Sequence, residues 1–247
     1  MDKATRELRE DYHSSCYSRH NVCSEGTYQF YERFYERLLK CHLPPDRNAS
    51  LVDIGCGVGY LARALMAMGY TNVRGVDLDP DQLRVCSHMA GVEVVEADAI
   101  AFLEGCADQS IAGTMMFDIL EHIPKAELLH LCREVWRVLQ PGGALTVRVP
   151  NMSNLFAASC RYVDITHEVG FTESSLSQLL HLAGFEDVQH HSSSPRMKRL
   201  SWLREAVNEA LHRMLRRIVI GPVPGPKLFG HDLLTVARKA GSTASSS

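Results

Sequence analysis

The chain has 247 residues, 45% of them hydrophobic, and its formal net charge of −3 at pH 7 gives no reason to expect nucleic acid as a partner. Its eight cysteines form no CxxC pair, which argues against a zinc ribbon or a disulfide framework and for a reducing compartment. No apolar leader and no run long enough to cross a bilayer is visible, so a cytoplasmic protein is expected.

Residues 1–47 are expected to form an N-terminal helical cap. Aromatic residues and leucines recur at helical spacing over 27–41, where Phe30, Phe34 and Leu38 share one face. Such a helix could simply pack on the main domain, or it could act as a lid over a ligand.

From residue 48 to residue 240 the pattern predicts one α/β domain in which strands alternate with helices. This alternation predicts a mostly parallel sheet with right-handed crossovers and helices on both faces. Residues 150–171 are expected to form a substrate loop, 195–230 a helical insertion before the last strand, and 241–247 a disordered tail. The expected strands are 50–54, 73–76, 92–95, 111–117, 144–149, 185–190 and 233–236; the expected helices are 60–68, 80–89, 99–104, 125–139 and 173–183.

A glycine-rich turn follows the first strand of this domain. Asp53 precedes Gly55-Cys56-Gly57-Val58-Gly59, and Tyr60 stands where a dinucleotide-binding loop needs its third glycine. A G-K-[ST] sequence, which would indicate a phosphate-binding loop, is also missing from this turn. The turn therefore favours a nucleoside that carries a cation and an amino acid rather than phosphates.

Two further acidic positions follow the second and third strands. Asp77 could accept hydrogen bonds from both hydroxyls of a ribose. Asp98 could accept from an adenine amino group, and Ala99 could offer its backbone N–H to the ring. Each aspartate could instead be an ordinary helix cap or turn residue.

Several stretches of the chain carry a resemblance to a known family: LVDIGCGVGYLARAL, VRGVDLDP, VVEADA, MMFDILEHI, LQPGGALTVRVPN and FTESSLSQLLHLAGF. Over residues 48–192 and the final strand they resemble the class I S-adenosylmethionine-dependent methyltransferases. The resemblance implies a Rossmann-like sheet of seven strands with the last strand antiparallel, and S-adenosyl-L-methionine as the cofactor. The cofactor contacts that it implies are Asp53, Gly55, Cys56, Gly57, Gly59, Asp77, Leu78, Asp98, Ala99 and Phe117.

A candidate metal site follows the fourth strand. Asp118, Glu121 and His122 lie at i, i+3 and i+4, so they would converge on one helical turn. Such groups suit Mg²⁺, Mn²⁺, Fe²⁺ or Zn²⁺. The order D-x-x-E-H is similar to the E-x-x-E-H site of small-RNA 2′-O-methyltransferases and to a stretch in ubiquinone-biosynthesis O-methyltransferases. Those families use a further histidine downstream, and His167 is the candidate here.

The same residues also allow chemistry without a metal. An alcohol needs a base or a metal before it can attack a methyl group, and His122 or His167 could take its proton at neutral pH. These groups therefore favour O-methylation. The stretch RYVDITHEVGFTESSLSQLLHLAGF resembles a loop in bacterial methyltransferases of glycan biosynthesis, which suggests a sugar or another small polar molecule as acceptor.

Two other functions stay open at this point. One is an RNA 2′-O-methyltransferase, supported by the D-x-x-E-H likeness and opposed by the acidic net charge. The other is a catalytically silent binding subunit with a methyltransferase fold. Residues 196–219 carry seven Lys or Arg against two Glu and an apolar stripe. They could pack on their own domain, dock a partner, cover the cleft or touch an anionic membrane. The oligomeric state is left open.

Overall fold

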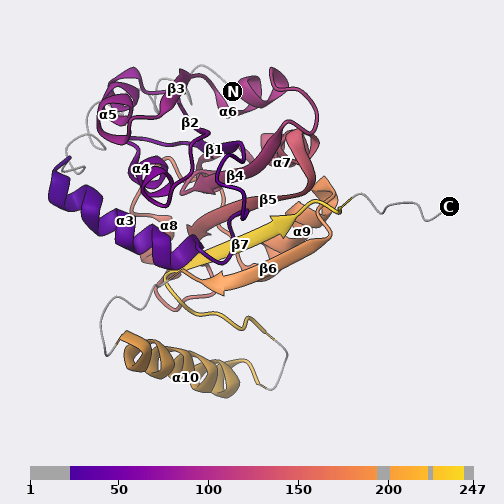
Figure 1. Ribbon diagram of the computed structural model, residues 1–247. Helices are drawn as coiled ribbons and strands as arrows, with labels where there is room; N and C mark the ends of the chain where they lie inside the picture. Colours follow the sequence, from indigo (N-terminus) through magenta and orange to yellow (C-terminus); the bar gives the residue numbers. More distant parts are fainter. Residues whose placement is uncertain (1–22, 194–200, 222–224, 242–247) are drawn as a thin grey trace.

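The computed structural model describes residues 23–193, 201–221 and 225–241 (Figure 1). The expectations for residues 1–22, 195–200 and 242–247 lie outside these described residues. The centre of the fold is a seven-stranded sheet with the order β3-β2-β1-β4-β5-β7-β6. The strands are β1 (Leu51–Ile54), β2 (Val73–Asp77), β3 (Glu93–Glu96), β4 (Ile111–Phe117), β5 (Leu139–Pro150), β6 (Asp187–Ser192) and β7 (Asp232–Arg238).

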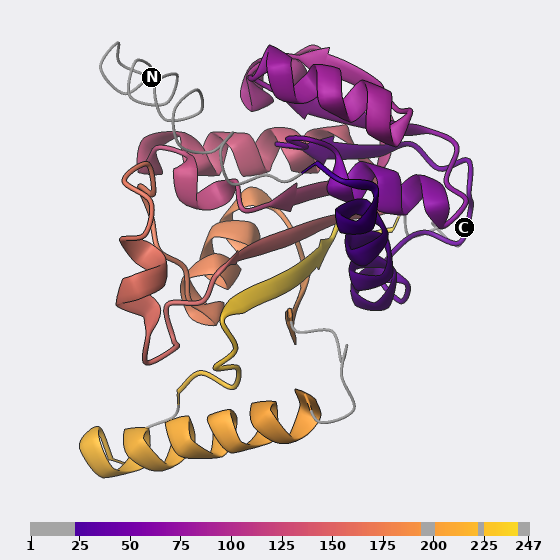
Figure 2. The same ribbon diagram turned by 90° about the vertical axis from the view of Figure 1, so that its left-hand side faces the viewer.

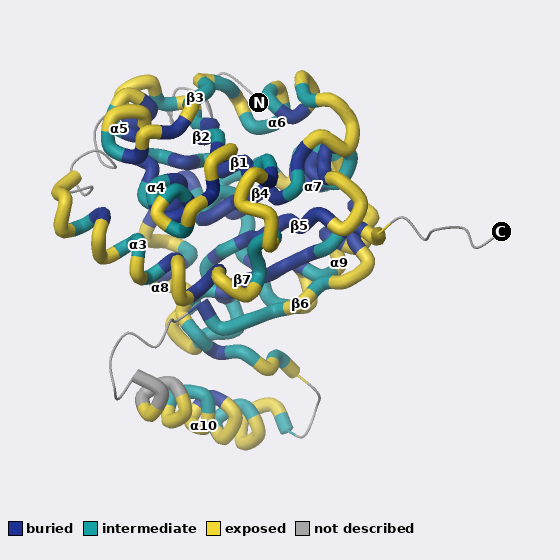
Figure 3. Tube along the Cα trace, viewed as in Figure 1, coloured by how far each residue is buried: buried dark blue, intermediate teal, exposed yellow. Residues whose placement is uncertain are grey.

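The sheet confirms the predicted fold class. Strands β1 to β5 pair in parallel, whereas β7 runs antiparallel to both of its neighbours, β5 and β6. The two central strands β1 and β4 are buried along almost their whole length (Figure 3), as expected of parallel strands covered on both faces.

Helices cover both faces of the sheet. The described helices are α3 (Glu25–Leu39), α4 (Tyr60–Ala67), α5 (Pro80–Ala90), α6 (Ala99–Glu104), the 3₁₀ helix η2 (Leu120–His122), α7 (Lys125–Val138), α8 (Ala157–Arg161), α9 (Glu173–Ala183) and α10 (Ser201–Val219). One apolar cluster joins α3, α4 and α5 to the sheet, and the other joins α6, α7 and α9 to it. Helix α10 lies beyond the sheet, apart from both layers (Figures 1 and 2). None of the helices in the described ranges has the length and hydropathy that a bilayer crossing requires.

The start of β5 differs from its prediction. The strand was expected to begin at residue 144, but Pro141–Gly143 lies inside β5, and Leu139 already pairs with Ile111 of β4. A register shift between Ile111 and Gly113 accommodates the extra residues, and Gly142 has a left-handed φ of 77°. The glycines therefore form an irregular start to the strand instead of preceding it.

Helix α3 buries only part of the face that carries its apolar residues, since Leu38 is buried and Phe34 packs against the same cluster. Its buried side chains are Tyr28, Tyr35, Leu38 and Leu39, whereas Phe30 is 50% exposed. Polar contacts with the glycine turn and with α4 hold the helix in this orientation. The Tyr28 hydroxyl donates to the Val58 carbonyl at 2.6 Å, and Arg63 pairs with Glu25 at 2.5 Å and with Glu32 at 2.7 Å. Helix α3 is thus fixed against the segment that contains the glycine turn.

Candidate active site

Most of the predicted site residues gather at the carboxyl ends of the three neighbouring strands β2, β1 and β4. Ile54 of β1 pairs with Val76 of β2 on one side and with Met116 of β4 on the other. The turns after these strands therefore lie side by side, at the edge where open α/β sheets bind ligands.

The glycine turn after β1 needs glycine at both of its ends. Gly55 has φ 74°, and an added Cβ would overlap the Cδ1 atom of Ile119. Gly59 has φ 86° and caps α4, and a Cβ there would lie 2.5 Å from the Sγ atom of Cys86. The sequence D-x-G-x-G-x-G thus encodes a backbone that packs closely against two neighbouring segments.

Asp77 joins the glycine turn to the end of β2. Its Oδ2 accepts from the backbone N–H of Gly57 at 2.8 Å, and its Oδ1 accepts from the N–H of Asp79 at 3.0 Å. The next residue, Leu78, has 48% of its surface exposed. An exposed leucine beside a carboxylate offers an apolar contact and a hydrogen-bond acceptor at one place, which suits a nucleoside.

Asp98 caps the N-terminus of α6. Its Oδ1 accepts from the backbone N–H groups of Ile100 and Ala101, at 2.9 and 3.3 Å. Both bonds go to the same oxygen. Asp98 therefore has the alternative role of a helix cap. The predicted hydrogen bond with an adenine would have to be accepted by Oδ2.

Asp53 is a buried carboxyl group inside β1. Only 2% of its surface is exposed, and none of the described residues hydrogen-bonds its Oδ2. Burial and, to a smaller extent, the nearby Asp77 carboxylate raise its pKa to about 7, against the opposing effect of the Ala62 backbone N–H. A cation bound beside Asp53 would favour its ionised form.

A second cluster combines Glu121, His122 and His167. Each offers one ligand atom, and these atoms lie within 4.8 Å of one another. The two imidazole rings are 4.7 Å apart between centroids. The structure thus brings three of the four predicted metal ligands together.

The ring of His122 is held by a relay that the sequence analysis missed. Its Nδ1 lies 2.8 Å from the Oγ1 of Thr166, whose hydroxyl donates to Asp164 Oδ1 at 2.7 Å. Because that hydroxyl has only one proton to donate, it accepts from Nδ1–H of His122. Nε2 is then the nitrogen that carries no proton in the neutral ring. The spacing D-x-T-H at 164–167 was the signal that could have indicated this relay.

Glu121 fastens the substrate loop to η2. Its backbone carbonyl accepts from the N–H groups of Glu168 at 2.6 Å and Val169 at 3.2 Å. Its side chain is 2% exposed, and no described residue hydrogen-bonds Oε2. Burial, and then the nearby Asp118 carboxylate, raise the pKa of Glu121 well above its usual range. A buried carboxyl with an unbonded oxygen is a group that a divalent ion would satisfy.

Asp118 does not join this cluster, so its predicted place on a helical turn with Glu121 and His122 is wrong. Asp118 has a left-handed φ of 57°, and the helical residues begin only at Leu120. Its carboxylate pairs with Arg148 of β5, where Nε donates to Oδ1 at 3.2 Å. The mostly buried guanidinium needs a counter-ion, and the Asp118 carboxylate supplies it.

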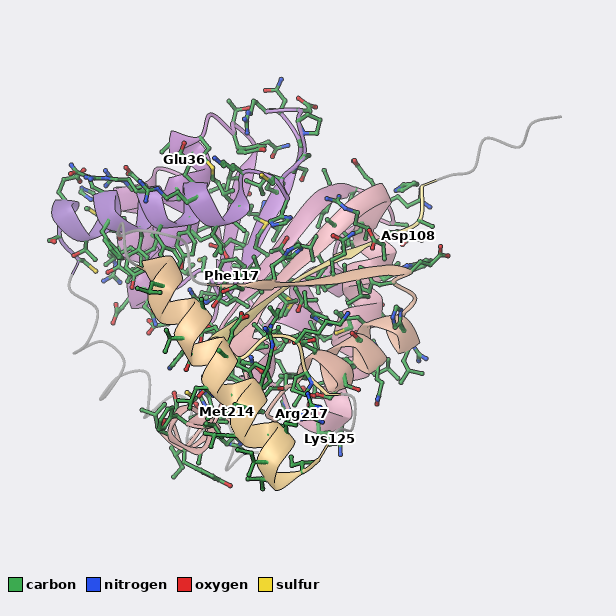
Figure 4. The ribbon with its side chains drawn as sticks, turned by 90° about the horizontal axis from the view of Figure 1, so that it is seen from below. Glu36, Asp108, Phe117, Lys125, Met214 and Arg217 are labelled. Carbon is green, nitrogen blue, oxygen red and sulfur yellow. The ribbon has the colours of Figure 1, made fainter. Side chains whose placement is uncertain are left out.

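Helix α3 also contributes to this site. The ring centroids of Tyr35 and Phe117 lie 5.7 Å apart. The Cζ atom of Arg148 lies over the Phe117 ring, 5.4 Å from its centroid. Burial raises the pKa of the Tyr35 hydroxyl. Phe117 lies between α3 and α10 in the view of Figure 4. The described part of the cap therefore forms a wall beside Phe117.

The loop asparagines have structural partners. Asn151 donates to the carbonyls of Leu228 and Gly230, at 3.0 and 3.2 Å, and Asn154 donates to the carbonyl of Phe229 at 2.8 Å. They hold the substrate loop against the segment before β7.

Comparisons with known proteins agree with this arrangement. Residues 51–143 match a family described as a methyltransferase domain. A ubiquinone biosynthesis O-methyltransferase from Cupriavidus pinatubonensis is 36% identical over 109 residues, which cover 41% of this chain and 41% of that protein. A sterol 24-C-methyltransferase from Neurospora crassa is 24% identical over 193 residues, or 72% of this chain and 50% of that protein. The chain thus spans half or less of these relatives' lengths.

Solved structures share the fold. A SAM-dependent methyltransferase from Archaeoglobus fulgidus superposes with a TM-score of 0.63 at 24% identity, covering 86% of this chain and 99% of that one. A possible histamine N-methyltransferase from Thermotoga maritima gives a TM-score of 0.61 at 19% identity, covering 95% and 99%. The matched domain lies on the strands that carry the glycine turn, and the sheet has the expected antiparallel β7. Residues 51–143 thus match a methyltransferase domain, and the chain as a whole shares the fold of S-adenosylmethionine-dependent methyltransferases.

Proposed function

We propose that the chain transfers a methyl group from S-adenosylmethionine to a hydroxyl oxygen of a sugar, a glycan or another small polar molecule. The observation that carries this proposal is the relay Asp164–Thr166–His122 next to Glu121 and His167, in which Nδ1 of His122 carries the proton and the neutral imidazole can act as a base through Nε2. A hydroxyl needs such a base, whereas an amine that is already basic does not.

The residues after β1, β2 and β3 fit the methyl donor. Asp53 has a buried oxygen without a described partner, which a cationic ligand would satisfy. Asp77 and the exposed Leu78 suit a ribose and the adenine beside it. We propose that the cofactor lies across these residues, with its sulfonium end toward Phe117.

When bound, S-adenosylmethionine supplies a methyl group activated by the positive sulfur. This chain's residues then have three tasks. Phe117, Tyr35 and the loop around Thr166 exclude water and align the acceptor with the methyl carbon. Nε2 of His122 would take the proton of the acceptor hydroxyl as its oxygen accepts the methyl group that the cofactor would supply. Thr166 and Asp164 hold the protonated ring in place.

Glu121, His122 and His167 would hold a divalent ion in a metal-assisted version of this reaction. Such an ion would lower the pKa of the acceptor hydroxyl. We expect Mn²⁺ or Zn²⁺ to bind in calorimetry, and we expect Glu121→Gln to weaken that binding by about tenfold or more, because the substitution removes a charged ligand. EDTA should then lower turnover, and an added divalent ion should restore it.

The control for this experiment is Glu127→Gln, which changes the same side chain in the first turn of α7, outside the cluster. It should leave metal affinity unchanged. Full turnover in EDTA together with no metal binding would contradict the metal-assisted version. Full turnover in EDTA would also leave His122 as the base without assistance.

Asp53 predicts a dependence of stability on pH. Because its pKa is raised from 3.8 to about 7, the folded chain without ligand prefers the protonated form. Its stabilising contribution is therefore complete below pH 3.8 and is lost as the pH rises through about 7. We expect Asp53→Asn, which stays neutral, to raise the free energy of unfolding at about pH 8 by on the order of 2 kcal/mol and to change it little at about pH 4.

Urea unfolding of the two proteins at the two pH values measures this difference. The same substitution should weaken S-adenosylhomocysteine binding, since a neutral amide cannot balance the charge of the ligand's ammonium group. Asp81→Asn, at an exposed position in the first turn of α5, serves as the control at both pH values. Equal stability of Asp53→Asn and the wild type at the higher pH would contradict the assigned protonation state.

A further inference from the structure

Helix α10 packs on the body of the protein through its polar face. His212 is 2% exposed, and its ring lies 5.1 Å from the ring of Phe229. Its Nε2 accepts from the backbone N–H of Leu155 at 2.9 Å, while Nδ1 bonds the carbonyl of Asn208 at 2.8 Å. The Asn208 side chain donates to the Phe229 carbonyl at 3.2 Å. A buried histidine and an asparagine therefore anchor the helix.

The apolar face of the same helix is exposed. Five large apolar residues, separated by four, four, three and four positions, make one stripe along the helix, and each has between 44% and 72% of its surface exposed: Leu203, Val207, Leu211, Met214 and Ile218. A surface helix of a globular protein normally turns such a stripe toward the core. Here the stripe faces outward, and Figure 3 shows how much of α10 is exposed. Figure 4 places Met214 and Arg217 on the helix as seen from below.

The neighbouring substrate loop exposes apolar side chains too. Leu155, which is bonded to His212, begins a segment whose exposed members also include Phe156, Tyr162, Val163 and Ile165. The next residues of this loop, Thr166 and His167, belong to the acceptor side of the candidate active site. Helix α10 and this loop are thus joined through the hydrogen bond between His212 and Leu155.

The distribution of charge indicates what would cover this surface. Residues 196–219 carry seven Lys or Arg and two Glu, although the whole chain has a net charge of −3, so the remainder carries −8. Two copies of α10 packed stripe to stripe would bring two basic segments together. An anionic lipid surface instead offers negative charge to the arginines and an apolar layer to the stripe.

We propose that the stripe of α10 docks the protein on an anionic phospholipid membrane. The helix lies in the plane of the interface, with the stripe among the acyl chains. Arg217, which is exposed at the edge of the stripe, reaches the phosphate groups. This proposal stands apart from the methyl-transfer proposal, because membrane docking needs no reaction.

The test is sedimentation of the full chain with large vesicles of phosphatidylcholine, with and without phosphatidylglycerol. We expect binding to the vesicles that contain phosphatidylglycerol and little binding to pure phosphatidylcholine. Met214→Asp should reduce the bound fraction by about tenfold, since it removes an apolar side chain that would enter the lipid and adds a charge there. Ala206→Asp adds the same charge at an exposed position outside the stripe, and it should bind within about twofold of the wild type.

Light scattering and S-adenosylhomocysteine binding complete the design. Unchanged cofactor binding in both variants shows that the fold is intact. The proposal is overturned if the wild type ignores anionic vesicles, or if the two aspartate variants bind them equally. It is also overturned if Met214→Asp converts a dimer to a monomer without vesicle binding, because the stripe would then belong to a second copy of the chain.

Discussion

Replacement of Asp77 by alanine is expected to weaken S-adenosylhomocysteine binding by about 100-fold or more. The carboxylate is proposed to accept hydrogen bonds from both ribose hydroxyls, and each such charge-assisted bond contributes about 1.5–3 kcal/mol. Asp77 also holds the backbone N–H groups of Gly57 and Asp79, at 2.8 and 3.0 Å. The substitution therefore removes a ligand contact and loosens the glycine turn at the same time.

Isothermal titration calorimetry with S-adenosylhomocysteine measures this loss. Asp77→Asn separates the two effects, because one amide oxygen can still accept from Gly57 but cannot replace both carboxylate oxygens. We expect it to preserve the melting temperature better than alanine does and still to bind weakly. Asp81→Ala, at an exposed position four residues along the chain, should leave the affinity unchanged. Wild-type affinity in Asp77→Ala would remove Asp77 from the cofactor site.

The second large effect is expected at His122. His122→Ala should lower the turnover of a hydroxyl acceptor by about 10²–10⁴-fold, which is the usual contribution of a positioned general base. Binding of S-adenosylhomocysteine should be preserved, because the cluster lies after β4 whereas the proposed cofactor contacts lie mainly after β1, β2 and β3. Initial rates with a set of sugar and phenol acceptors, together with calorimetry, give both quantities.

Thr166 tests the relay independently. Thr166→Val keeps the shape and removes the hydroxyl that fixes the ring of His122, so turnover should fall by about tenfold while cofactor affinity is kept. Thr166→Ser should restore most of the rate. His130→Ala, an exposed histidine on α7 that pairs with Glu104, is the matched control. A wild-type rate in His122→Ala would contradict the assignment of the base.

The sheet and the glycine turn were predictable because both depend on local sequence. Apolar runs separated by helical periods determine the parallel strands, and the turn after β1 requires left-handed backbone at Gly55 and Gly59. The motifs extended the fold prediction to the last strand, because the family that they resemble has an antiparallel final strand. Strand β7 confirms that prediction.

The acceptor side was predicted less well because its contacts are distant in sequence. Asp118 pairs with Arg148, thirty positions away, and His122 meets Thr166 forty-four positions away. Helical spacing gave no account of the left-handed Asp118 or of a short 3₁₀ helix. For α10, periodicity identified the apolar stripe, but only the burial of His212 shows which side faces the protein.

The place of β7 has a consequence for biosynthesis. Strands β2, β3 and β4 can each pair soon after they leave the ribosome, because one partner strand of each precedes it in the chain. Strand β6, in contrast, pairs with β7, which also fills the position between β5 and β6. The edge of the sheet beside the acceptor loop therefore waits for residues 232–238 to emerge. During translation, the half that carries the glycine turn can assemble first, and the half that carries the proposed acceptor site closes last.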